Sequence, residues 1–100
     1  MNWLKKLLQR PLDNFKREAD KAIVAAIVWV RSGGPKKRIV QELKEDLADL
    51  IAKAKLPSPL GIILVMIVMD QDWESLLDKP EDDLIAELER LRAKIAGARL

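Results

Sequence analysis

The 100-residue sequence contains no cysteine, histidine, tyrosine or threonine. Without cysteine, disulfides and thiolate metal sites are excluded, and the redox compartment is left open. Without histidine and cysteine, the serines lack the usual base that activates a nucleophile. We therefore predict that the protein is not an enzyme and has no cofactor, metal site or small-molecule substrate. The joint absence of four residue types also suits a designed or engineered chain, a hypothesis that rests on composition alone.

Long apolar runs are missing as well. A transmembrane helix needs about 20 apolar residues, and the two best runs, 22–30 and 60–69, are about half that length. A signal peptide is not supported, because charged residues at 16–20 interrupt any apolar region that would follow Lys5 and Lys6. These features predict a soluble, cytoplasmic protein.

The sequence also lacks a large excess of charge of either sign. The formal net charge is +2, which is too small to indicate a nucleic-acid partner. Residues 1–56 are nevertheless basic, and residues 57–100 are acidic. We interpret this asymmetry as attraction between the two halves of one fold.

What the sequence does contain is typical of one globular domain, with 49% apolar and 34% charged residues. The apolar positions recur at steps of three and four, which is the helical period. The spacing predicts a short amphipathic helix at 2–9, ended or kinked by Pro11, and four longer helices at about 11–32, 35–56, 59–78 and 80–97.

Glycine and proline set the predicted boundaries between these helices. Gly33 and Gly34 provide a stop, because glycine takes the left-handed conformation at a helix end without penalty. Pro35 suits a first helical position. Ser58 followed by Pro59 predicts a helix start, and Asp78 with Glu81 resembles a capping box. The helix from 59 either runs on to 77 or breaks at 70–72, with Asp72 capping a last turn.

Links of one or two residues between helices of similar length imply antiparallel neighbours. We therefore predict a single all-α domain over 1–100, an up-down four-helix bundle with a short additional N-terminal helix. The alternative is a βαβ unit, because 22–30 and 61–69 are rich in β-branched residues and flank a helix. That alternative leaves a two-stranded sheet with two bare edges.

Two charged motifs are candidates for binding sites. The acids of Asp70–Glu81 fall at spacings that resemble an EF-hand calcium loop, but Ser75 replaces the turn glycine and Pro80 precedes the last acid. Acidic residues at two helix starts explain the same pattern without calcium. The basic cluster 35–38 looks like a phosphate-binding patch, but no aromatic residue is close in sequence, and we interpret it as a solvated first turn.

The strongest signal is surplus apolar surface in the stretch Leu60–Met69, which has no charged or polar side chain. A bundle helix buries only one face, so some of these residues must point away from the core. We predict that the interaction residues are Ile62, Ile63, Met66, Ile67 and Met69. Their cover is the N-terminal helix, a second copy of the chain, or lipid. We favour a homo-oligomer with a structural or interaction role.

An alternative function involves the N-terminal segment. Helical spacing places Trp3, Leu4, Leu7 and Leu8 on one face and the neighbouring lysines on the other. Such a helix either inserts in a membrane surface, with Lys5 and Lys6 at the headgroups, or packs on the bundle as a lid.

Overall fold

The chain folds into helices, as the apolar spacing predicts. The structure, a computed structural model, describes the backbone of residues 2–99 and the side chains from Gln9 to Arg99. Its elements are α1 (Asn2–Arg31), α2 (Lys36–Ala54), α3 (Leu60–Met69), the 3₁₀ helix η1 (Ser75–Asp78) and α4 (Glu81–Ala96). Residues 2–99 contain no β-strand. The all-α prediction is confirmed, and the βαβ alternative is wrong.

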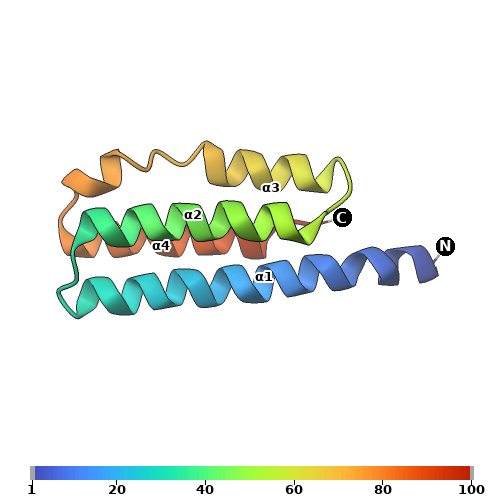
Figure 1. The fold of residues 1–100 in the computed structure, drawn as a ribbon, viewed down its shortest axis with the longest axis horizontal. Coiled ribbons are helices and arrows are strands. Elements are labelled where there is room, and N and C mark those ends of the chain that lie inside the picture. The colour runs from blue at the N-terminus through green and yellow to red at the C-terminus, as the bar shows by residue number, and fades with distance from the viewer. Residues whose placement is uncertain (1, 100) are drawn as a thin grey trace.

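The four α-helices pack in a way that is compatible with a helical bundle. Helix α1 packs against α2 and α4, and α3 packs against the same two helices, so α1 and α3 lie at opposite corners. Successive helices reverse direction, and the N-terminus of α1 lies at the same end as the start of α3 (Figure 1). The described part measures 48 × 21 × 20 Å. None of its helices combines the length and the hydropathy needed to cross a membrane.

The core is entirely apolar. Among the described side chains, no polar or charged one is buried. Every helix contributes residues that are nearly inaccessible to solvent, including Leu12, Ile23, Leu47, Leu64, Leu76, Leu84, Leu88 and Leu91. Because apolar burial is the dominant favourable contribution to folding, this core is what holds the helices together.

Helix α1 differs from the prediction at its N-terminal end. It is one continuous helix of 30 residues with Pro11 inside it, so the predicted separate helix at 2–9 is not confirmed. Proline has no N–H and cannot bond to the carbonyl four residues earlier. That loss is local, whereas Leu, Lys and Gln on its N-terminal side are favourable helix formers. Leu12 and Phe15 are buried directly after Pro11 and fix the helix on the bundle.

The turn between α1 and α2 depends on two glycines. Gly33 has φ +82°, a left-handed conformation that favours glycine, and the Gly34 N–H donates to the carbonyl of Trp29 at 3.0 Å. The Trp29 ring lies where a Cβ on Gly34 would be. The guanidinium of Arg38 lies 5.8 Å from the centroid of the same ring. The predicted stop at the glycine pair is confirmed.

The helix starts show small corrections. Prolines 35, 59 and 80 precede the first helical residues instead of occupying the first helical position. No side-chain hydrogen bond caps α3 or α4, so the capping role predicted for Ser58 and the capping box predicted for Asp78 and Glu81 are wrong. Because proline fixes φ near helical values, it can position the chain there without a side-chain cap.

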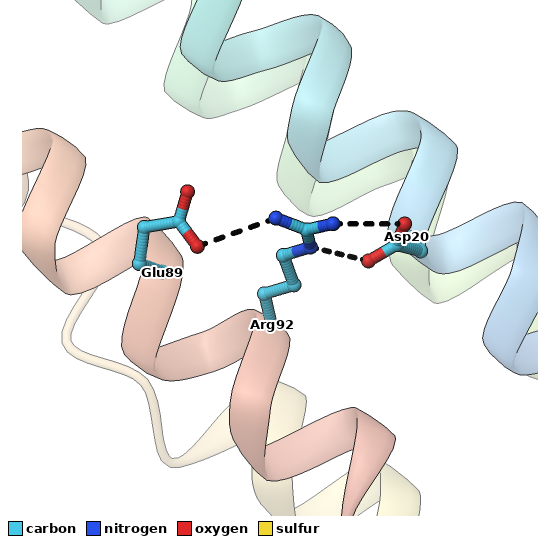
Figure 2. A network of polar contacts seen from close by, with 3 residues as sticks. All are labelled: Asp20, Glu89 and Arg92. Atoms are coloured by element: carbon cyan, nitrogen blue, oxygen red, sulfur yellow. Dashed lines mark hydrogen bonds and ion pairs between the residues drawn. The ribbon is translucent and has the colours of Figure 1, made fainter.

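A polar clamp joins α1 to α4. Arg92 of α4 lies between Glu89 on its own helix and Asp20 on α1 (Figure 2). Its guanidinium donates two hydrogen bonds to the Asp20 carboxylate, one of them of 3.3 Å from Nη2 to Oδ2. Nearby, the Lys16 ammonium donates to the carbonyl of Ala96 at 2.9 Å, where α4 ends. The hydrogen bonds to Asp20, together with its charge, raise the pKa of Arg92 above its ordinary value.

Candidate functional site

Helix α3 buries one narrow stripe and leaves most of its other side chains exposed. Leu60, Leu64 and Val68, at steps of four, are the residues that enter the core. The first α3 hydrogen bonds are accepted by the preceding loop, with Gly61 N–H donating to Pro57 O at 2.9 Å and Ile63 N–H to Pro59 O at 3.0 Å. Helix α3 is therefore held against α2 and α4 along one edge only.

The outward face of α3 consists of large apolar side chains. We call this set of residues the α3 face, and its exposed fractions are Ile62 55%, Ile63 42%, Val65 42%, Met66 54% and Met69 61%. Four of the five predicted interaction residues belong to it. The fifth, Ile67, is partly buried and packs against the core.

Val65 is the member that sequence reasoning did not single out. The signal was present in the spacing, because Ile62, Val65, Met66 and Met69 follow steps of three and four. These residues lie opposite Leu60, Leu64 and Val68 once that stripe is assigned to the core.

A shallow groove borders the α3 face on the side of α4. It has a volume of about 330 Å³, and its lining residues are Ile63, Met66, Ile67, Asp70, Gln71 and Lys94. Its floor is apolar and its polar rim carries both signs of charge. An apolar centre with a polar rim is the usual composition of a protein–protein interface.

The end of α3 is fixed by the segment that follows it. The Asp70 N–H donates to Met66 O at 2.8 Å. The indole of Trp73, 7% exposed, donates to Val68 O at 2.9 Å. Ser75 N–H donates to the Asp72 carboxylate at 3.2 Å. The predicted break at 70–72 is therefore confirmed, and the longer helix to 78 is wrong. The cap predicted for Asp72 is not confirmed, because the residue that precedes η1 is Glu74, which makes no side-chain capping hydrogen bond.

The acidic stretch Asp70–Glu81 folds as a turn, the 3₁₀ helix η1 and the first residue of α4. Residues 75–78 form the 3₁₀ helix η1, and the Asp72 carboxylate accepts a hydrogen bond from its first N–H, that of Ser75. Within residues 2–99, no group of three or more acidic side chains lies close enough together to hold a metal ion.

The basic cluster 35–38 has partners within the chain. The Lys36 ammonium donates to the carbonyl of Lys79 at 2.7 Å. Arg38 pairs with Glu42 at 3.1 Å and lies over Trp29, an aromatic residue that is distant in sequence. These contacts link α2 to the loop before α4 and to α1, and they give the cluster a structural role.

The N-terminal candidates, Trp3, Leu4, Leu7 and Leu8, belong to the backbone of α1, but their side chains lie outside the described part of the structure. Helix α1 is continuous and does not pack against α3 of the same chain, so the roles predicted for this face, as a lid or at a membrane surface, stay predictions. Comparison with known proteins adds no further information about the site. No protein-family model, curated protein or solved structure matches this chain.

Proposed function

We propose that this protein is a self-associating helical bundle whose α3 face binds a second copy of the chain. The observation that carries the proposal is the set of five large apolar side chains, 42–61% exposed, on a helix without a single charge. Contiguous exposed apolar surface of this kind is uncommon on monomeric proteins and typical of interaction sites.

The energy of covering the α3 face is of the right order for reversible association. Full burial of one such side chain contributes about 1.5–3 kcal/mol, so burying the exposed half of five of them contributes roughly 4–7 kcal/mol per chain. Association itself costs an estimated 4–15 kcal/mol in lost freedom. Counted over both chains the gain is roughly 8–14 kcal/mol, which exceeds the association cost over much of its range and supports a weak complex whose population depends on concentration.

Charge near the α3 face favours a protein partner over an anionic membrane. Asp70, Asp72 and Glu74 follow α3 directly and are exposed. Anionic lipid surfaces attract basic segments and repel acidic ones. The membrane-surface role of the N-terminal segment is the alternative outcome of the test below.

The test is the mass of the full chain in solution as a function of concentration, by sedimentation velocity. We expect the mass to rise from monomer toward dimer across the micromolar range. Replacing Met66 by Glu should leave a folded monomer, because a charge without a partner is costly to bury in an apolar contact. The matched control is Val28→Glu, since Val28 is 57% exposed but lies on α1.

A wild-type mass that is monomeric up to high micromolar concentration, together with binding to anionic vesicles, would replace self-association by the membrane-surface role. A drop in mass for Val28→Glu equal to that for Met66→Glu would move the contact away from α3.

A further inference from the structure

The N-terminal end of α1 extends beyond the rest of the bundle. Helix α1 has 30 residues and its neighbour α2 has 19, a difference of about 16 Å at 1.5 Å per residue. Gln9 and Arg10 are exposed, and Leu12 is the first buried residue among the described side chains of α1. In Figure 1 the blue end of α1 projects past the turn that joins α2 to α3. We call residues 2–10 the overhang.

The position of the overhang suits a second copy. Helices α1 and α3 lie at opposite corners, and both begin at the same end of the bundle (Figure 1). Consider a two-fold axis at that end of the bundle, perpendicular to the helices. It places the α1 corner of one copy opposite the α3 corner of the other. The overhang of one copy then lies along α3 of the other, in the opposite direction. The overhang and α3 have nine and ten residues, so their lengths match.

The charges of the two helix ends are complementary. The first turn of α1 has no acid to balance the positive end of its dipole, and the sequence of the overhang has Lys5, Lys6 and Arg10 but no acid. The last turn of α3 has no basic residue, and Asp70 follows it. Antiparallel pairing brings the positive end of the overhang to the negative end of α3, which is the favourable arrangement of dipoles and charges.

The area that a stable interface needs also favours the overhang as the partner of α3. Standard interfaces bury about 800 Å² per partner over about 20–30 residues. Helix α3 has ten residues and presents five large apolar side chains, so contact between two α3 helices alone is too small. An overhang from the partner adds apolar residues on both sides of the two-fold axis.

We propose that the partner of the α3 face is the overhang of a second copy, exchanged reciprocally in a two-fold dimer. This inference rests on the proposed function and specifies which segment covers α3. Each dimer has two identical contacts, each made by residues 2–10 of one chain and the α3 face of the other.

Mixing two full-length variants tests the exchange. One carries Leu4→Glu with Leu8→Glu, which helical spacing places on one face of the overhang. The other carries Ile62→Glu with Met66→Glu on α3. Each variant alone should be monomeric, because each lacks one half of both contacts. Their equimolar mixture should form a heterodimer through the one contact that is still intact.

Charge reversal tests the orientation. Lys5→Glu with Lys6→Glu should raise the dimer dissociation constant at least tenfold, and adding Asp70→Lys with Glu74→Lys in the same chain should restore most of the affinity. Lys37→Glu, an exposed change at the far end of the bundle, is the control and should leave the constant unchanged. Circular dichroism and thermal melting of every variant confirm that the bundle is folded.

The outcomes separate the two proposals. If the overhang variant dimerises as well as wild type while the α3 variant does not, the exchange is wrong and self-association through α3 stands. If the mixture stays monomeric although both variants are folded, the exchange is also wrong. If wild type itself is monomeric, both proposals are wrong.

Discussion

The indole N–H of Trp73 donates a hydrogen bond of 2.9 Å to the main-chain carbonyl of Val68. Val68 lies in the last turn of α3, where backbone carbonyls have no partner within the helix. A side chain from the following loop therefore satisfies a helix end that has neither a C-terminal glycine nor a basic residue. The same contact buries Trp73 and closes the corner of the bundle beyond α3.

Replacing Trp73 by Phe tests this contact. Phenylalanine keeps one aromatic ring but lacks the five-membered ring and its N–H, so the buried Val68 carbonyl loses its donor, which costs about 1–3 kcal/mol, and a small cavity adds to the loss. Urea unfolding followed by circular dichroism should show this loss. Trp73→Ala also leaves a cavity and should cost about 3–5 kcal/mol. Equal stability of Trp73→Phe and wild type would mean that water replaces the indole at no cost.

Gly34→Ala should destabilise the turn between α1 and α2. An added Cβ would overlap the Trp29 ring and lie 2.9 Å from Ile39 Cδ1. Overpacking of this kind costs about 1–3 kcal/mol. The effect should shrink in a Trp29→Ala background, because the two residues are in contact and their changes are then not additive. The same penalty in both backgrounds would exclude the ring as its cause.

Two substitutions two residues apart on α3 should have opposite consequences. Leu64 is fully buried, so Leu64→Glu should unfold the protein at every concentration. Met66 is 54% exposed, so Met66→Glu should keep the helical circular dichroism and change only the mass. Loss of helix in both variants would show that the α3 face belongs to the core.

The clamp between Asp20 and Arg92 should respond to salt. Its side chains are 45% and 40% exposed, and exposed ion pairs are weak and screened by ions. Asp20→Asn should lower the melting temperature slightly in low salt, with the difference fading toward 1 M sodium chloride. A difference that persists at 1 M would indicate a hydrogen bond that salt does not screen.

Stability should be nearly flat with pH between about 6 and 9, because no histidine or cysteine titrates there. The raised pKa of Arg92 does not change this expectation. A group whose pKa rises on folding contributes stability below its unfolded pKa and loses it only as pH passes the folded value. For an arginine both values lie far above this window. A pronounced slope in melting temperature near neutral pH would contradict this expectation.

The helices could be predicted because their spacing and breakers are local features of the sequence. The glycine pair at 33–34 and the break at 70–72 are examples. The continuity of α1 could not be predicted, because Pro11 forbids one hydrogen bond and the outcome depends on how Leu12 and Phe15 are buried. The inward face of α3 could not be predicted from the sequence either. When every position is apolar, periodicity gives no direction, and only packing selects Leu60, Leu64 and Val68.

The segment from α3 to α4, residues 60–79, forms one corner of the bundle and is only partly α-helical. Beyond Met69, the regular α-helical hydrogen bonds end, and the backbone bonds join residues only two or three positions apart. These bonds are Trp73 N–H to Gln71 O, Leu77 N–H to Glu74 O and Lys79 N–H to Leu76 O. Segments with few protected backbone bonds open at lower free energy than the helices around them. Amide hydrogens of residues 70–79 should therefore exchange with deuterium well before those of α1, α2 and α4. Because Trp73 and Leu76 are buried members of the core, we expect each such opening to withdraw them and to let water reach the centre of the molecule while α1, α2 and α4 stay folded.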